Sequence, residues 1–136
     1  MEERLVSYET ALLAKEKLFN IPTLYFYFDS KLKYNHSIKP RNNNIIAGSL
    51  EVSAPTQSLL QKWLRDKHNL HIEIRFLRLN WIFFIYDLTN PNRECLLNIC
   101  WLGDSDYFES KGLPTVIHTY EQALETALIN ALKLIK

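Results

Sequence analysis

The feature that most constrains the fold is a change in apolar periodicity at His71, inside residues 53–88. Before His71, Leu59, Leu60, Trp63 and Leu64 recur at the spacing of one buried helix side. After it, apolar Ile72, Ile74 and Phe76 alternate with polar residues, as in a half-buried strand. Residues 81–88 are apolar on both faces and predict a central strand. A helix and two successive strands are therefore expected here.

Residue types at the ends of this helix agree with its periodicity. Pro55 is expected in the first turn, where its missing N–H costs nothing, with Ser53 or Thr56 as the capping residue. The helix is expected to end near Asn69, because asparagine tolerates the left-handed conformation found at helix ends.

Further elements flank this unit. A first helix is expected after Val6 or Ser7, ending at residues 20–22, with one apolar side formed by Tyr8, Ala11, Leu12, Leu18 and Phe19. The aromatic run at 23–28 predicts a strand, and the turn residues 90–92 predict a hairpin to a strand at 94–102. A Thr119-x-x-Gln122 capping box and an Ala/Leu repeat predict a helix over 119–135.

This order of elements predicts an α+β fold. One antiparallel sheet packed by two or three helices would form a two-layer sandwich. The 136 residues fit a single domain over 1–136, with a basic irregular loop at about 30–50.

Composition and spacing favour no enzyme class. Three glycines leave no glycine-rich phosphate loop, and no serine nucleophile motif occurs. The spacing of Cys95 and Cys100 suits neither a disulfide nor a zinc ribbon, and two free thiols suit a reducing cytoplasm. No run reaches the roughly 20 apolar residues that span a bilayer. We therefore expect a non-enzymatic protein with no catalytic residues, no cofactor, no metal and no membrane contact, in the cytoplasm.

Three weaker patterns leave alternatives open. His68 and His71 have H-x-x-H spacing, but across a helix end, where two surface histidines are the favoured interpretation over zinc binding. The acidic cluster Asp104, Asp106 and Glu109 is interpreted as a solvated loop, with ion binding as the alternative. A pairing of Cys100 with His118 is permitted by any chain of this composition, and a buried inert cysteine is the usual outcome.

The charge is concentrated in the middle of the chain. Residues 30–80 hold nine Lys and Arg against three Asp and Glu, a balance of +6, although the whole chain carries only +1. Residues 30–50 contain no acid, and they supply the candidate partner-binding residues Lys31, Lys33, Tyr34, Lys39 and Arg41. The plainer interpretation is a mobile, solvated connection with a short strand near 44–50. The sharper one is a contact segment for an acidic protein or RNA.

Aromatic residues near these cations raise direct nucleic-acid binding as a second hypothesis. Tyr25, Tyr27 and Tyr34 lie close in sequence to Lys31 and Lys33, and RNA-binding sheets expose aromatics beside basic residues. The glycine-containing RNP pattern is absent, which favours a core role for the aromatics.

Two segments carry a resemblance. SAPTQSLLQKWLRDKHNLHIEI (53–74) and YEQALETALINALKLI (120–135) resemble small uncharacterised phage and prophage proteins of the Bacteroidetes. The similarity lies in core and cap residues, so it transfers no catalytic role. It implies an accessory protein that binds and modulates a host protein or ribonucleoprotein complex in a bacterial cytoplasm. By analogy with anti-CRISPR proteins, an inhibitor of an RNA-guided CRISPR effector nuclease is the first candidate, and a small RNA- or DNA-binding module is the alternative.

Overall fold

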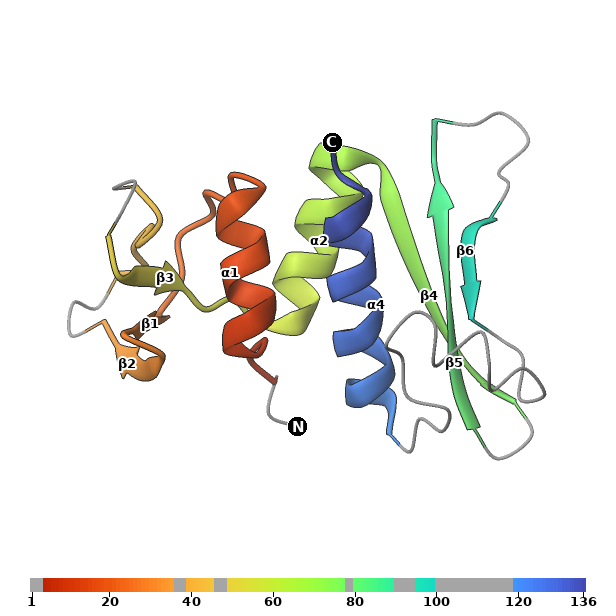
Figure 1. Ribbon diagram of the computed structural model, residues 1–136, viewed down its shortest axis with the longest axis horizontal. Coiled ribbons are helices and arrows are strands. Elements are labelled where there is room, and N and C mark those ends of the chain that lie inside the picture. Colours follow the sequence, from red (N-terminus) through yellow and green to blue (C-terminus); the bar gives the residue numbers. More distant parts are fainter. Residues whose placement is uncertain (1–3, 36–38, 46–48, 78–79, 90–94, 100–118) are drawn as a thin grey trace.

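In the part of the chain that the structure describes, three helices form the middle, and a small antiparallel sheet lies on each side of them (Figure 1). The computed structural model describes residues 4–35, 39–45, 49–77, 80–89, 95–99 and 119–136. The helices are α1 (Tyr8–Glu16), α2 (Gln57–His68) and α4 (Tyr120–Leu134). One sheet, in the order β2-β1-β3, contains β1 (Tyr25–Phe28), β2 (Lys31–Tyr34) and β3 (Glu51–Ser53). The other, in the order β4-β5-β6, contains β4 (Leu70–Leu77), β5 (Asn80–Asp87) and β6 (Cys95–Ile99).

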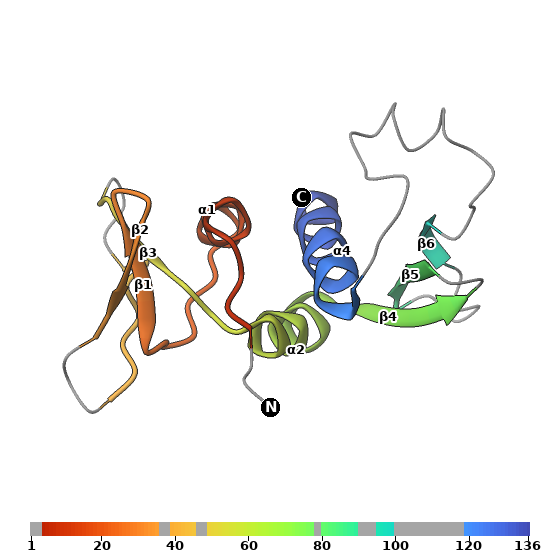
Figure 2. The same ribbon diagram turned by 90° about the horizontal axis from the view of Figure 1, so that it is seen from below.

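The predicted α+β class, with antiparallel sheets packed by helices, is confirmed. The strands divide between two sheets, however, so the layers run sheet, helices, sheet, where a two-layer sandwich with one sheet was expected (Figure 2). Helix α1 faces the first sheet through β3, whereas α2 and α4 face the second through β4 and β5. Because the helices have a sheet on each side, apolar residues are needed on more than one side of the helix layer.

The core runs without interruption through these layers. Val52 of β3, Ala14 of α1, Leu64 of α2 and Ile85 of β5 all belong to one buried cluster. Helix α4 contributes six fully or nearly fully buried residues, which are Ala123, Leu124, Ala127, Leu128, Ala131 and Leu132. Its alanines let α1 and α2 approach closely, and α4 contacts both.

The unit around the change of period has the predicted arrangement. Strands β4 and β5 pair antiparallel from Leu70 opposite Asp87 to Leu77 opposite Asn80. Ile72, Phe83 and Ile85 are buried under the helices, and β5 is the central strand, with β6 on its other side. Phe76 is the exception on β4: it is 56% exposed and packs on the Trp81 ring, 5.0 Å between centroids.

Hydroxyl side chains cap all three helices. The Oγ of Ser7 accepts from the Thr10 N–H at 3.2 Å, and the Oγ1 of Thr119 accepts from the Gln122 N–H at 3.0 Å. Thr56, one of the two predicted candidates, caps α2 by accepting from the Leu59 N–H at 3.2 Å. Pro55 lies just before this cap and not in the first turn, which corrects the expected helix start. Asn69 ends α2 in the left-handed conformation at φ 57°, as predicted.

The first helix is shorter than predicted, and its buried side differs. It ends at Glu16, because Leu18 takes a left-handed φ of 68° and the Phe19 N–H returns to the Ala14 carbonyl at 2.9 Å. This turn carries Phe19 into the core and leaves Leu18 81% exposed. Leu12, predicted on the buried side, is also exposed, and the helix instead buries Thr10, Ala11 and Ala14.

The segment predicted as irregular from residue 30 begins with a strand. Asp29 and Ser30 have φ values of 51° and 64°, which form a two-residue hairpin turn between β1 and β2. The strand expected near 44–50 is also displaced, since β3 begins at Glu51. The aromatic run forms β1, which is the central strand of this sheet because it pairs with both β2 and β3.

Candidate functional site

The structure places the five predicted partner-binding residues on the first sheet and on the segment beside it. Lys31, Lys33 and Tyr34 belong to β2, and all are exposed. Lys39 and Arg41 follow in the next described segment and are exposed as well. Arg41 and Thr23 exchange two backbone hydrogen bonds of 2.9 Å, which fastens the segment beside β1. The sheet therefore gathers the cations that the sequence only placed near one another.

Buried asparagines hold this segment in place. The Nδ2 of Asn35 donates to the Thr23 carbonyl at 2.8 Å and to the Oδ1 of Asn43 at 3.1 Å. The Asn43 backbone N–H donates to the Ser53 Oγ at 2.9 Å, and its side-chain amide reaches Glu51 at 3.3 Å. Asn35 and Asn43 are only 6% and 4% exposed. The two buried asparagine side chains thus bond to each other, and the network joins Thr23, Glu51 and Ser53 to this segment.

The neighbouring asparagine extends this network toward the helices. Asn44 accepts from the Ser53 N–H at 2.8 Å and donates to the Phe19 carbonyl at 3.0 Å. The Lys15 ammonium also donates to the Ser49 and Glu51 carbonyls, both at 2.8 Å. The interpretation of a solvated connection is therefore wrong for residues 41–44, which hydrogen bonds tie to the sheet and to Phe19 after the end of α1.

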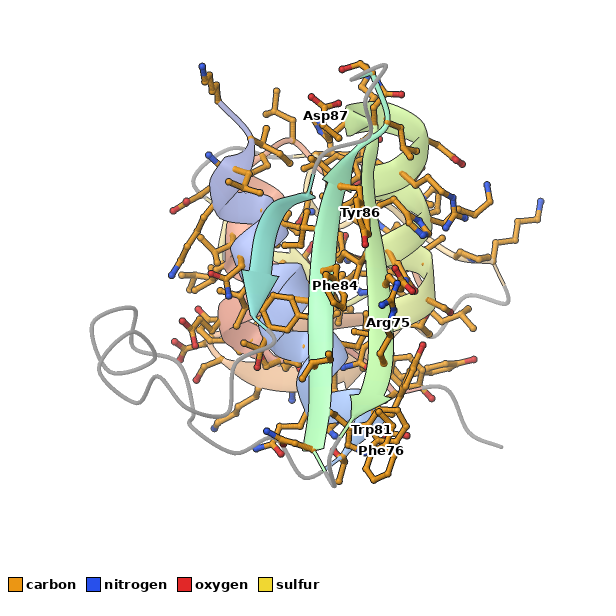
Figure 3. All side chains as sticks on the ribbon, turned by 90° about the vertical axis from the view of Figure 1, so that its right-hand side faces the viewer. Arg75, Phe76, Trp81, Phe84, Tyr86 and Asp87 are labelled. Carbon is orange, nitrogen blue, oxygen red and sulfur yellow. The ribbon has the colours of Figure 1, made fainter. Side chains whose placement is uncertain are left out.

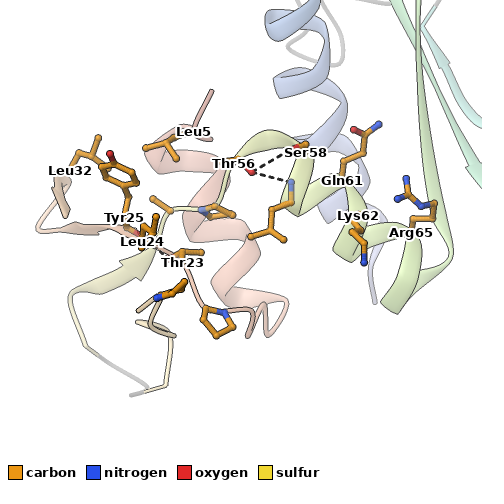
Figure 4. A pocket seen from close by; sticks show the side chains of 15 residues that line it. Leu5, Thr23, Leu24, Tyr25, Leu32, Thr56, Ser58, Gln61, Lys62 and Arg65 are labelled. Carbon is orange, nitrogen blue, oxygen red and sulfur yellow. Dashed lines mark hydrogen bonds between the residues drawn. The ribbon is translucent and has the colours of Figure 1, made fainter. Parts of the chain in front are cut away.

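An open groove of about 1030 Å³ lies between the β1–β2 hairpin and α2 (Figure 4). Its apolar lining consists of aliphatic side chains and prolines, which are Leu5, Leu24, Leu32, Leu59, Pro22, Pro40 and Pro55. Leu24 and Leu32 are 39% and 48% exposed, so water reaches them in the free protein. Exposed apolar side chains gathered in one concave surface are typical of interaction sites.

The charged residues in the groove lining are both cations. Lys62 and Arg65 lie one turn apart on α2, and no Asp or Glu is among the described lining residues. Asp66, just outside the lining, bonds to the Lys62 ammonium at 2.8 Å and lies 3.9 Å from Arg65. The hydrogen bond from Lys62 lowers the pKa of Asp66 below its ordinary value. An ion pair this exposed is weak, so an incoming carboxylate competes with it readily.

The predicted basic residues are sequence neighbours of two residues that line this groove, but they are not in its described lining. Leu32 lies between Lys31 and Lys33, and Pro40 lies between Lys39 and Arg41 in sequence. Side chains alternate along β2, so the two lysines occupy the opposite face of the strand from Leu32. The sequence prediction identified the cations but missed the apolar residues between them. The alternation K-L-K-Y is the signal that would have revealed β2 and its apolar face.

The three tyrosines proposed for base stacking do not share one environment. Tyr25 and Tyr34 are exposed and make an edge-to-face pair, with ring centroids 5.2 Å apart. Tyr27 instead packs edge-on to Tyr8 against the core, and its hydroxyl donates to the Val6 carbonyl at 2.7 Å. Burial, with the Glu125 carboxylate as a second cause, raises the pKa of Tyr27. Tyr27 therefore has a structural role.

The outer face of the second sheet is occupied by its own side chains (Figure 3). The Arg75 guanidinium lies 4.6 Å from the centre of the Phe84 ring and is paired with Glu73. The Phe84 ring is stacked beside that of Tyr86 at 6.1 Å, and His71 also stacks on Tyr86 at 6.4 Å. These mutual contacts make this face a weaker candidate for binding than the groove.

The remaining sequence candidates are separated or lie beyond the described ranges. His68 packs against Trp63 and His71 against Tyr86, on different elements. Within the described residues, no group of three His, Cys, Asp or Glu side chains has the arrangement of a metal site. Several candidates fall outside the residues that the structure describes, namely Cys100, Asp104, Asp106, Glu109 and His118. Nothing is described of the Cys95 side chain in β6.

His68 supplies a pH-dependent contribution to stability. Its Nε2 is buried without a hydrogen-bond partner among the described residues, and its ring lies edge-on to Trp63 at 4.7 Å. Burial first, and the nearby Lys67 charge second, lower its pKa from the ordinary 6.5. Between its folded and unfolded pKa values, His68 is therefore protonated in the unfolded chain and neutral in the folded chain. Stability is full above about pH 6.5 and falls as the pH drops from there toward the folded pKa.

Urea unfolding at a series of pH values measures this effect. Stability is expected to fall from about pH 7.5 to pH 5, and the fall should be smaller in His68→Leu, because leucine has no proton to gain. Identical pH profiles for the two proteins would show that His68 stays hydrated in the folded state.

Comparisons with known proteins identify no relative: no family model, no curated protein and no solved structure matches the chain. Among the described helices, none has the length and apolar character required to cross a membrane. The groove, the cations in its lining and the exposed basic residues of the first sheet are therefore the features that point to a function.

Proposed function

We propose that the protein is a non-enzymatic binding protein that modulates a host protein complex by covering one of its surfaces. The observation that carries the proposal is the open apolar groove between the β1–β2 hairpin and α2, whose lining includes the cations Lys62 and Arg65. A surface of this kind gains free energy when a partner buries its leucines, whereas the cations favour an acidic partner and accelerate the encounter.

The resemblance of 53–74 and 120–135 to phage and prophage proteins supplies the proposed context. In that context the partner is a host protein or ribonucleoprotein complex in the bacterial cytoplasm. An RNA-guided CRISPR nuclease, inhibited by the bound protein, is the first candidate to test. The segment 53–74 includes the α2 wall of the groove, whereas the basic residues at 31–41 lie outside both similar segments.

A second candidate function is direct binding of RNA or DNA. The observation that favours it is the exposed Tyr25–Tyr34 ring pair on the β1–β2 hairpin, in which β2 also carries Lys31 and Lys33 on its opposite face. Exposed aromatics beside cations form stacking platforms for single-stranded nucleic acid. The aliphatic and proline lining of the groove favours the protein partner instead.

Removing the four predicted cations tests both candidates. The variant Lys31→Ala, Lys33→Ala, Lys39→Ala and Arg41→Ala is expected to bind the captured partner about tenfold more weakly, equivalent to about 1.4 kcal/mol. Its fold should persist, because exposed substitutions of this kind cost less than about 0.5 kcal/mol each. Capture from host lysate, with and without nuclease treatment, followed by titration with the isolated partner, provides the measurement.

The control removes exposed cations that are outside the described groove lining. Lys133→Ala and Lys136→Ala together should leave binding nearly unchanged. Salt then separates the two candidates: four phosphate contacts give a slope of roughly −3 to −4 in log affinity against log salt, whereas a protein partner gives a shallower one. Equal binding by the quadruple variant and the wild type would contradict a role for these cations.

A further inference from the structure

We infer that the groove binds a short peptide segment of the partner in which apolar anchor side chains lie next to carboxylates. This inference rests on the proposed function and specifies its partner. It follows from the lining of the groove, from the sign of the charges at one end of it and from its open shape.

The apolar part of the groove matches amino-acid side chains better than nucleotide bases. Leu24 and Leu32 of the hairpin and Leu59 of α2 present branched aliphatic groups to the same space. Grooves for single-stranded nucleic acid instead present aromatic rings, on which successive bases stack. Among the described lining residues, Tyr25 is the one aromatic, and its ring is already packed against Tyr34. Aliphatic anchors of a peptide are thus the complementary chemistry.

The cationic part of the groove selects carboxylates beside those anchors. Lys62 comes about one turn and Arg65 nearly two turns after Leu59 on α2, so they continue the wall that the leucine begins. Figure 4 shows Leu24 and Leu32 at the hairpin end, with Lys62 and Arg65 toward the other end. A peptide lying along the groove therefore places its apolar residues over the hairpin and its carboxylates over α2.

A substitution at Asp66 tests whether the groove prefers a peptide that carries carboxylates. It pairs with Lys62 at 2.8 Å from just outside the lining, so it competes with a carboxylate of the peptide. Asp66→Asn removes this competitor and is expected to strengthen binding of an acidic peptide about two- to threefold, in line with the small energies of exposed ion pairs.

The test measures fluorescence anisotropy of labelled probes with the full chain. The probes are a peptide in which leucines are flanked by glutamates, the same peptide with lysines for glutamates, the same peptide with serines for leucines, and a single-stranded RNA. The Leu/Glu peptide is expected to bind about tenfold more tightly than either altered peptide, a difference of about 1.4 kcal/mol. Tighter binding of RNA than of the Leu/Glu peptide would overturn the inference.

Two groove variants locate the binding. Leu32→Ser should weaken binding of the Leu/Glu peptide about tenfold, and Lys62→Glu with Arg65→Glu should reverse the preference to the Leu/Lys peptide. Lys133→Glu with Lys136→Glu changes the net charge equally on the exposed end of the chain and should preserve the original preference. An unchanged preference in the Lys62/Arg65 variant would overturn the inference, because the peptide would then bind elsewhere.

The failure of this inference differs from the failure of the proposed function. If the wild type captures a host protein, and the Leu32→Ser and Lys62/Arg65 variants capture it equally well, the groove inference is wrong and the binding function stands. If nuclease treatment releases everything that the wild type captures, the proposed protein-binding function is wrong, and the peptide inference is overturned with it.

Discussion

Replacing Trp63 by alanine is expected to lower the free energy of unfolding by about 3–5 kcal/mol, the largest effect of any single substitution proposed for this chain. Trp63 is 6% exposed and belongs to the buried cluster that joins the layers. Its ring contacts Phe19 edge-on at 5.3 Å and His68 at 4.7 Å, which links α2 to the turn after α1. Alanine leaves a cavity that Phe19 fills only in part, so lost contacts add to lost apolar burial.

Equilibrium unfolding in urea provides the measurement. Trp63→Phe keeps most of the ring contacts and should cost less than alanine, whereas Leu134→Ala, at a side chain 41% exposed, should cost less than about 1 kcal/mol. A loss below about 1 kcal/mol for Trp63→Ala would contradict the packing of α2 between the two sheets.

Replacing Glu125 by alanine is expected to cost about 3 kcal/mol, because its carboxylate joins all three helices. The Oε1 of Glu125 accepts from the Ser7 N–H at 2.6 Å and from the Thr10 hydroxyl at 2.7 Å, both in the first turn of α1. Its Oε2 accepts from the Gln57 amide of α2 at 2.9 Å. Thr10 and Gln57 are buried, so alanine leaves their donors without this acceptor. The negative charge also complements the start of α1.

Two further variants separate the charge from the hydrogen bonds. Glu125→Gln retains an acceptor oxygen without the charge and should fall between the wild type and alanine. Glu16→Ala, at an exposed glutamate at the end of α1, should change stability by less than about 0.5 kcal/mol. Equal stabilities of Glu125→Ala and Glu16→Ala in urea would show that solvent replaces the Glu125 contacts.

The sequence predicted those parts of the fold that depend on residues close together in the chain. The change of period at His71 marks the α2–β4 boundary, and the residues that end or start helices, such as Asn69 and Thr119, act within a few positions of themselves. We predicted the pairing of β4 with β5 because a strand that is apolar on both faces needs neighbouring strands, and the half-buried strand comes just before it in the sequence. These features depend on spacing, which the sequence displays directly.

The features that the sequence did not reveal depend on distant contacts or on unusual backbone conformations. The spacing of residues does not indicate that the aromatic strand β1 belongs to a separate sheet. That sheet depends on the pairing of β1 with β3 and on the helices that lie between the two sheets. Leu18 adopts a left-handed conformation that glycine normally supplies, so the end of α1 carried no signal. A run of asparagines such as that around Asn43 is typical of a loop, yet Asn43 is buried and hydrogen-bonded to Asn35 and Ser53.

The candidate site likewise has one part that the sequence predicted and one part that it did not. Its cations were visible as a segment without acids, whereas the groove requires Leu32 and Pro40 to meet Leu59 across the fold. Residues so far apart in sequence share no pattern, and a single sequence offers no covariation to join them. The site therefore emerges only from the placement of the hairpin beside α2.

Site-specific photocrosslinking in host lysate shows whether a partner is bound in the groove beside α2. A photoreactive amino acid replaces Leu24, Leu32 or Leu134, whose side chains have similar exposed fractions of 39%, 48% and 41%. We expect one host protein to be crosslinked from Leu24 and Leu32 and not from Leu134. Crosslinking of that protein from Leu134 alone, with none from the two groove leucines, would contradict this expectation.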